Sequence, residues 1–263
     1  MKVSILLPTL GERIDELKRL FNSLEEQTNK SFELIIVSQG NHDIIEELLK
    51  KFTFKYTQIK IEKRGLSLAR NIGMKYVNGN YVVLADDDAW YPKDSINTII
   101  TEMKNNNEDI ICFKIFDPIS GKYYKNYSKH KQKVGTIQIL KKSSIEICFN
   151  LIKINKSKIV FNEEFGLGSE FQSGEENLII NDLRKEGYKI KFIDKTIVYH
   201  RIRRNTIIDE KFIRSKAEVL KRILGKFGAC IYLNLILIKN FRKIKGIKNA
   251  KAFINAIKMT ILN

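Results

Sequence analysis

Short apolar and β-branched runs alternate with helix-type patterns along the first third of the chain, and this alternation constrains the fold more than any other feature. Apolar residues recur every three or four positions within residues 12–26, 44–49 and 67–77, which indicates amphipathic helices. Strands are predicted before, between and after them, at residues 3–7, 34–37, 56–61 and 81–84. Strand–helix repeats of this length predict a parallel sheet with right-handed crossovers.

The pattern after residue 90 is less regular. Pro92 is predicted to be the first residue of a helix running to about Lys104, because the N–H that proline lacks has no helical partner there. Residues 123–134 have no clear period and predict a loop or hairpin over the sheet. The remaining predictions are strands at 110–116 and 145–154, a helix at 175–186 closed by Gly187, and two short strands at 190–193 and 197–199.

Composition indicates a globular protein in a reducing compartment. The chain has 263 residues, of which 43% are apolar, enough to bury a large core. Cys112, Cys148 and Cys230 are odd in number and lack metal-site spacing, so neither a disulfide framework nor a zinc site is expected. The apolar run before Pro8 is too short for a signal or membrane segment. We therefore expect a cytoplasmic protein.

Positive charge is concentrated at the C-terminal end. The formal charge is +17, and the residues from Arg201 onward contain 16 Lys and Arg against 3 Asp and Glu, a net +13. Residues 205–263 are predicted to form two or three basic amphipathic helices, and the apolar stretch 229–238 is too short to span a bilayer. Such a region suits an anionic membrane surface, nucleic acid or a phosphorylated substrate. Solvated helix faces are the alternative interpretation.

Polar residues follow three of the predicted parallel strands at the point where each ends. Pro8 and Thr9 follow the first strand, Gln39 follows the second within Ser-Gln-Gly, and three aspartates at 86–88 follow the fourth. Ligands of open parallel sheets bind beyond the carboxyl ends of the strands. The convergence of three strand ends therefore predicts a ligand site.

Two interpretations of the consecutive carboxylates Asp86, Asp87 and Asp88 remain open at this point. Mg²⁺ is usually held by one or two carboxylates together with substrate phosphates. In an extended segment Asp86 and Asp88 would face one side and Asp87 the other, so one face could hold a metal. Alternatively, these acids cap the helix predicted to begin at Pro92.

Several segments together resemble the family 2 glycosyltransferases, which have the GT-A fold. They occur in the order and rough spacing of that family over about residues 3–204, and the most diagnostic are the DDD and SGEE segments. The resemblance implies an α/β fold with a mostly parallel sheet flanked by helices, divided into a nucleotide-sugar half (1–116) and an acceptor half (117–204). The basic helical region at 205–263 would be an extension of this domain. The segments are VSILLPTLGERIDELKRLFNSLEEQT, ELIIVSQG, GLSLARNIGM, NGNYVVLADDDAWYP, FNEEFGLGSEFQSGEEN and VYHR.

The resemblance assigns metal-binding residues. The aspartates after the fourth strand match the family's DxD element, which binds the sugar nucleotide and its Mg²⁺ or Mn²⁺. Asp88 matches the main metal ligand, while Asp86 and Asp87 would face ribose, metal or sugar. His200 in VYHR matches a position that often completes the coordination, and imidazole suits Mn²⁺ better than Mg²⁺. The arginines at 201, 203 and 204 could then meet the diphosphate.

The resemblance also implies donor contacts. Pro8 and Thr9 match the start of the nucleotide pocket, and Arg70 in LARN matches a contact on the base and phosphate side. Where the family commonly has an Asp that reads the uracil imide, this chain has Gln39. An amide both donates and accepts, so uridine remains the expected base.

The SGEE segment carries the predicted catalytic base. Ser173-x-x-Glu176 has capping-box spacing, which would give Glu176 a purely structural role. The resemblance instead matches this segment to the acid that removes a proton from the acceptor hydroxyl. A carboxylate can do so if burial or a nearby charge brings its pKa towards neutrality. Glu176 is the predicted base and Glu175 the alternative.

The resulting expectation is an inverting glycosyltransferase of cell-surface polysaccharide or glycolipid assembly. It would move a sugar from a nucleotide diphosphate, with UDP as the default, to a hydroxyl of a glycan or lipid-linked saccharide at an anionic membrane surface. A metal-dependent nucleotidyltransferase is an alternative, although TLGER at 9–13 is a poor phosphate loop. The second alternative is a basic nucleic-acid-binding protein. The sequence contains no nucleic-acid motif and its positive charge lies away from the sheet, so no nucleic acid partner is expected.

Overall fold

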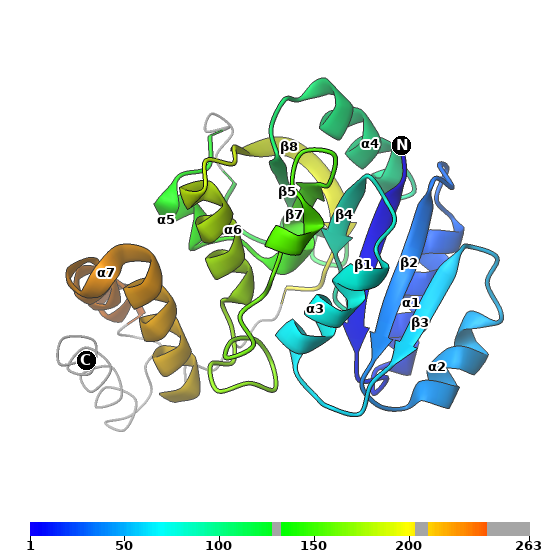
Figure 1. The fold of residues 1–263 in the computed structure, drawn as a ribbon, viewed down its shortest axis with the longest axis horizontal. Helices are drawn as coiled ribbons and strands as arrows, with labels where there is room; N and C mark the ends of the chain where they lie inside the picture. Colours follow the sequence, from blue (N-terminus) through cyan, green and yellow to red (C-terminus); the bar gives the residue numbers. More distant parts are fainter. Residues whose placement is uncertain (128–132, 203–209, 241–263) are drawn as a thin grey trace.

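One mostly parallel sheet organises the chain. The computed structural model describes residues 1–127, 133–202 and 210–240. The eight strands lie in the order β3-β2-β1-β4-β7-β5-β6, with β8 paired to β5 (Figure 1). Strands β1 to β4 are mutually parallel, whereas β7 runs antiparallel between β4 and β5. Their bounds are β1 Val3–Thr9, β2 Phe32–Ser38, β3 Tyr56–Lys60, β4 Tyr81–Leu84, β5 Ile110–Asp117, β6 Lys122–Tyr123, β7 Ile147–Asn150 and β8 Ile190–Tyr199.

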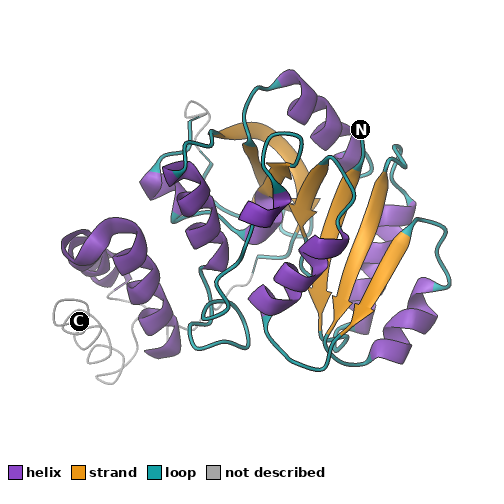
Figure 2. Cartoon of the chain, viewed as in Figure 1, coloured by secondary structure: helices purple, strands orange, loops and turns teal. Residues whose placement is uncertain are grey.

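Helices cover both faces of this sheet, as the predicted fold class requires (Figure 2). One apolar core lies between the sheet and α1 (Ile14–Glu25), α2 (His42–Leu49) and α4 (Ser95–Asn105). A second lies between the opposite face and α3 (Leu66–Tyr76) and α6 (Glu175–Lys185). Alternating side chains along β1 point to opposite cores, because successive residues of a strand face opposite sides of the sheet. The remaining short helices are α5 (Thr136–Ile139), η1 (Ser144–Glu146) and η2 (Lys156–Lys158).

The C-terminal helix α7 (Glu210–Asn240) forms a third core. It is interrupted at Gly225, whose φ of 72° and ψ of 172° are not helical. Ile213 and Leu220 before the break pack in one cluster with Leu178 of α6 and with Leu233 after the break. Among the described residues there is no helix of the length and apolarity that a membrane span needs. The boundary predicted at residue 204 remains a prediction, and residues 241–263 of the predicted extension lie outside the described ranges.

Three predicted element boundaries were wrong. Helix α4 begins at Ser95 and not at Pro92, because the Pro92 carbonyl accepts bonds from Ser95 and from the Gln27 side chain in a turn that precedes the helix. Strand β7 is shorter than predicted, since η1 occupies the residues before Ile147 and a turn follows Asn150. The two short strands predicted near the C-terminal side are one strand, β8, paired along β5 with an irregular register.

Candidate active site

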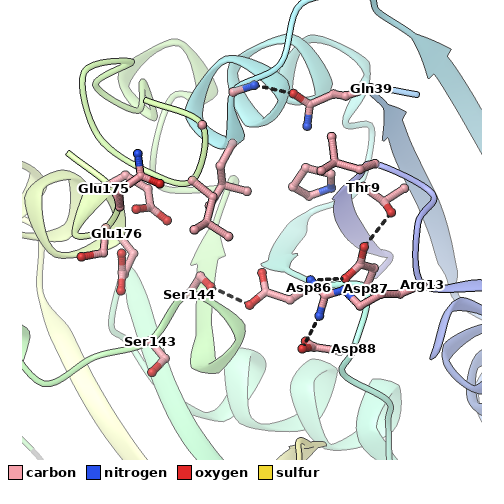
Figure 3. Close-up of a pocket in the computed structure, with 18 of the residues that line it drawn as sticks. Thr9, Arg13, Gln39, Asp86, Asp87, Asp88, Ser143, Ser144, Glu175 and Glu176 are labelled. Atoms are coloured by element: carbon pink, nitrogen blue, oxygen red, sulfur yellow. Dashed lines mark hydrogen bonds and ion pairs between the residues drawn. The ribbon is translucent and has the colours of Figure 1, made fainter. Parts of the chain in front are cut away.

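A cavity of about 680 Å³ opens where the carboxyl ends of β1, β2 and β4 meet α6 and the end of β8. The three strand ends therefore converge as the sequence predicted. Figure 3 shows the two glutamates of α6 across the cavity from the three aspartates. Of the predicted site residues, those that line it are Pro8, Thr9, Gln39, Asp86, Asp87, Asp88, Glu175, Glu176 and His200.

The three aspartates lie in a turn and not in an extended segment. The Ala89 N–H donates to the Asp86 carbonyl at 3.1 Å, so the backbone reverses immediately after β4. The prediction that Asp86 and Asp88 share one side is wrong for this reason, since Asp87 and Asp88 share the Arg13 guanidinium while Asp86 pairs with Arg70. The helix-cap interpretation is also wrong, because the residue that precedes α4 is Asp94.

A short antiparallel bridge joins the aspartate turn to the end of β8. The Trp90 N–H donates to the Tyr199 carbonyl at 3.1 Å, and the Tyr199 N–H donates back at 2.7 Å. Arg19 lies over the Trp90 ring and donates to the Asp88 carbonyl at 3.0 Å. This bridge brings His200 against Asp88, although 112 positions separate them in the chain.

Asp88 and His200 offer a coherent pair of ligands for a divalent cation. The His200 Nδ1 lies 2.8 Å from the Arg201 carbonyl, which can only accept, so Nδ1 carries a proton. In the neutral ring, Nε2 then presents a lone pair to the Asp88 carboxylate oxygen 3.1 Å away. Two facing acceptors need a proton or a cation between them, and a histidine bound through its other N–H to a carbonyl is the usual arrangement at metal sites.

The surrounding charges favour a positive charge, a proton or a cation, between His200 and Asp88. Burial would lower the pKa of His200, but the hydrogen bond to Asp88 and the charge of that carboxylate raise it above its ordinary value. Burial raises the pKa of Asp87, against the opposing hydrogen bond from Thr9 and charge of Arg13. No complete set of three or more His, Cys, Asp or Glu ligands is found within residues 1–127, 133–202 and 210–240. Further ligands would therefore come from substrate phosphates or water, as is common for Mg²⁺.

Arg13 is a site residue that the sequence reasoning missed. It follows β1 within TLGER, lines the cavity and pairs with both Asp87, at 3.0 Å, and Asp88. The sequence does contain a signal for Arg13, because this residue lies between the end of β1 and the start of α1, where ligands of parallel sheets bind. Ser144 was also missed, because it reaches the cavity and the Asp86 carboxylate only through the fold.

Arg70 lies behind the cavity wall and not in it. Its side chain is fully buried, and its guanidinium pairs with Glu175 at 2.6 Å and with Asp86 at 3.2 Å. This position differs from the predicted contact with base or phosphate. Arg70 instead links the aspartate turn to the start of α6. The Glu175 carboxylate is thereby held in a buried ion pair.

Glu176 lies in an environment suited to a proton acceptor. The capping box predicted with Ser173 is absent: Gly174 precedes α6 in a left-handed conformation, and no side-chain cap is formed. Burial and the charge of Glu175 raise the pKa of Glu176 to about 8. Arg70 and Lys216 of α7 oppose this rise. A pKa near 8 meets the condition required of a base near neutral pH.

Comparison with known proteins identifies the family. The sequence model described as "Glycosyl transferase family 2" matches residues 4–160, and the chain belongs to this family. Glycosyltransferase GlyA of Streptococcus pneumoniae is 25% identical over 221 residues, which cover 78% of this chain and 31% of GlyA. Poly(ribitol-phosphate) beta-N-acetylglucosaminyltransferase TarP of Staphylococcus aureus is 26% identical over 198 residues, covering 72% of this chain and 60% of TarP.

A solved structure shares the fold over nearly the whole chain. The crystal structure of residues 1–349 of S. aureus TarS in complex with UDP-GlcNAc aligns with a TM-score of 0.72 and 18% identity, covering 99% of this chain and 81% of that one. This likeness confirms the GT-A architecture. The chain spans about a third of the length of GlyA.

Proposed function

We propose that the protein is an inverting glycosyltransferase that moves a sugar from a nucleotide diphosphate donor to an acceptor hydroxyl. One observation carries the proposal: a single cavity is lined by the Asp88–His200 pair and by Glu176, whose pKa is raised. Figure 3 shows Glu176 across the cavity from Asp88. Transfer with inversion needs a group that stabilises the departing diphosphate and a base on the opposite face of the sugar. The family membership supports the same reaction.

The side chains divide the work by their positions. Glu176 accepts the proton of the acceptor hydroxyl as that oxygen attacks the anomeric carbon. Asp86, Asp87, Thr9 and Pro8 form the wall against which the donor is oriented. Arg13 supplies a positive charge at the edge of the aspartate turn, where a diphosphate would lie.

We propose Mn²⁺ or Mg²⁺ as the cofactor, held by Asp88 and His200. When bound, the ion would neutralise charge on the leaving diphosphate as a Lewis acid. The facing acceptor atoms of these two side chains support this assignment. Arg203 and Arg204, which could assist the diphosphate, lie outside the described residues.

A uridine diphosphate sugar is the proposed donor, since the TarS neighbour was crystallised with UDP-GlcNAc. The acceptor would be a hydroxyl of a cell-surface polysaccharide or lipid-linked saccharide; for the relative TarP the name gives a poly(ribitol-phosphate) acceptor. Loop residues between β5 and α6 form the irregular side of the cavity and would select the acceptor. Among them, Ser143, Ser144, Leu167 and Gln172 line it.

We also propose that the protein works at the cytoplasmic face of a membrane, bound through α7. Beyond the break at Gly225, α7 exposes an apolar stripe at helical spacing, formed by Phe227, Ile231, Leu235 and Ile238. This stripe lies in the region that carries the net +13 charge, and apolar residues beside basic ones suit an anionic lipid surface.

Isothermal titration calorimetry with UDP and its sugars, with and without Mn²⁺, tests the core of the proposal. We expect wild type to bind UDP in a Mn²⁺-dependent manner, and Asp88→Ala to lose that dependence while its thermal unfolding midpoint is retained. Hydrolysis or transfer of the bound sugar should follow the same dependence. UDP affinity that is identical with EDTA and with Mn²⁺ would count against the metal, and transfer at wild-type rate by Glu176→Gln would count against the proposed base.

A further inference from the structure

The first half of α7 holds the segment that precedes the two glutamates. Figure 1 shows α7 beside α6, and the two helices share an apolar cluster. The Ser215 hydroxyl of α7 accepts a bond of 2.8 Å from the Gln172 N–H, just before α6. Val219, one turn further along α7, lies against Gly174, the residue that precedes α6. The position of the start of α6 therefore depends on α7.

The same part of α7 reaches both the cavity and the end of α5. Phe212 of α7 lines the cavity. Lys216, one turn further along, is partly buried, and its ammonium group donates to the Leu140 carbonyl at 3.1 Å. Residues four apart in a helix lie on one face, so Lys216 extends from the side of α7 that is turned towards the site.

The residue that follows Glu176 is anchored at the same end of α5. The Asn177 side-chain amide donates to the Ile139 carbonyl at 2.9 Å and to the Lys142 carbonyl at 3.1 Å. The Lys216 ammonium group binds the carbonyl that lies between these two in the chain. This shared anchor brings the ammonium group close to the first turn of α6, where Glu176 lies.

Charged groups from three helices act on Glu176. Burial and then the charge of Glu175 in α6 raise its pKa, while the charges of Arg70 in α3 and Lys216 in α7 oppose that rise. Arg70 is already paired with two carboxylates, those of Glu175 and Asp86. Lys216 donates to a carbonyl and, within the described ranges, forms no ion pair. Its positive charge is therefore the one of the two that no other carboxylate holds directly.

The interaction between Lys216 and Glu176 affects both residues. Burial lowers the pKa of Lys216, the charge of Glu176 opposes this change, and the charge of Lys125 adds to it. Opposite charges that are partly shielded from water attract each other more strongly than they would at the surface. Loss of the Glu176 proton is therefore easier while the ammonium group stands nearby.

We propose that Lys216 is a positioning residue for the proposed base: its ammonium group stabilises the ionised Glu176 carboxylate, so that the reaction depends on the packing of α7 against α6. This inference rests on the proposed role of Glu176 and adds to it the element that supplies the opposite charge. Lys216 acts through Glu176 and needs no contact with the substrate.

The pH dependence of unfolding, compared with and without Glu176, tests the inference without any substrate. Because the folded pKa of Glu176 is raised, Glu176→Gln gains stability relative to its parent as pH rises, and the gain levels off at the folded pKa. In the wild-type background we expect this near pH 8. In the Lys216→Gln background, which keeps an N–H donor but no charge, it should occur about one pH unit higher. Denaturant titration at a series of pH values measures it.

Three further variants separate the charge of Lys216 from its packing. Lys216→Arg keeps the positive charge, and the gain should level off as in the wild-type background. Lys216→Met removes both the charge and the donor, and should behave like Lys216→Gln. Lys211→Met is the matched control, because Lys211 is an exposed lysine of the same helix, and it should change nothing. The rising limb of kcat/KM against pH should move with the unfolding data.

Particular results would overturn the inference. A gain that levels off at the same pH in the wild-type and Lys216→Gln backgrounds would do so, as would Lys216→Arg that resembles Lys216→Gln. An effect confined to Lys216→Met would assign the role to the bond with the Leu140 carbonyl and not to the charge. If Lys216→Met fails to fold, the glutamine and arginine variants decide. Transfer at the wild-type rate by Glu176→Gln would refute the proposed base even where Lys216 shifts the titration of Glu176, so the two failures are distinguishable.

Discussion

Two adjacent glutamates in the same cavity have different environments, and the difference separates their roles. The Glu175 carboxylate is 2.6 Å from the fully buried Arg70 guanidinium. The ion pair commits the Glu175 carboxylate to the protein. Glu176 makes no ion pair within the described part of the chain, and its pKa is raised. Glu176, with its raised pKa, is therefore the residue to which we assign the proposed proton transfer.

Substitution of each glutamate by glutamine should therefore have opposite consequences. Glu176→Gln should lower kcat about 10²–10⁴-fold while UDP affinity is kept, because a general base contributes about that much. Its thermal unfolding midpoint at pH 7 should be equal to or above that of wild type, since glutamine resembles the neutral form that the fold prefers. Steady-state kinetics provide kcat, and titration and scanning calorimetry on the same preparation provide the UDP affinity and the unfolding midpoint.

Glu175→Gln is the matched control at the neighbouring position. Of the described residues it leaves Arg70 with Asp86 as its one carboxylate partner, and breaking a buried ion pair costs about 3–5 kcal/mol. We expect a large fall in the unfolding midpoint. A Glu175→Gln protein with wild-type stability and no activity would instead assign the base to Glu175.

The pKa of Glu176 also predicts how activity and stability depend on pH. Burial and the charge of Glu175 place it at about 8, so the ionised fraction grows about tenfold per pH unit below that value. We expect log kcat/KM to rise with a slope near one up to about pH 8. Because the folded pKa lies above the ordinary value of 4.5, folding takes up a proton, and this contribution to stability is lost as pH rises through the folded pKa.

Measurements of kcat/KM and of the free energy of unfolding across pH 5–9 check the predicted pH dependence of activity and of stability. The rising limb should be absent from the residual activity of Glu176→Gln, and that variant should gain stability relative to wild type as pH increases. A wild-type kcat/KM that does not change between pH 6 and 8 would contradict the assignment.

At the scale of elements, the junction of α6 with α7 depends on Gly174. This glycine has a φ of 104°, and a Cβ built on it would lie 2.3 Å from Cγ2 of Val219 in α7. Gly174→Ala should therefore combine backbone strain with overpacking, at a cost of about 2–4 kcal/mol to the free energy of unfolding. Denaturant titration measures it.

Gly187 provides a matched control for the contribution of the backbone. It has a similar φ of 98°, but a Cβ there would meet no atom within 4 Å. Gly187→Ala should cost only the strain, about 1 kcal/mol or somewhat more. Adding Val219→Ala to Gly174→Ala should relieve the clash. Equal losses at the two glycines would show that α7 does not press against the start of α6.

At the scale of the whole molecule, membrane binding should depend on both the apolar stripe and the basic charge of the C-terminal region. We expect wild type to float with vesicles that contain anionic lipid at low salt. Phe227→Asp with Ile231→Asp should reduce the bound fraction about tenfold or more, because it removes exposed apolar area and adds negative charge. Vesicle flotation followed by gel densitometry measures the effect.

Ile119→Asp serves as the surface control, because Ile119 is 65% exposed in the turn after β5 and outside α7. It should float like wild type. High salt or neutral vesicles should also lower binding, since the electrostatic attraction is screened. Wild type that remains at the bottom of the gradient with anionic vesicles would refute the membrane proposal.

The sequence by itself determined the architecture and the location of the site. The alternating strand and helix patterns predicted the parallel half of the sheet, because periods of two and of three to four residues are local properties of the chain. The polar residues at three strand ends predicted the cavity, since the ends of parallel strands meet at one edge of a sheet. Motifs such as DDD and SGEE indicated the family before any contact was known.

Only the tertiary structure decided which partner each charged side chain takes. Asp86 and Asp88 face different neighbours because the backbone turns after β4, and Asp88 meets His200 because Trp90 and Tyr199 form a bridge. Arg70, predicted to contact the substrate, is buried and links Asp86 to Glu175. Arg13, which was not predicted as a site residue, pairs with Asp87. The physical reason is that ion pairs and pKa values depend on distances and burial across the fold, which local patterns do not contain.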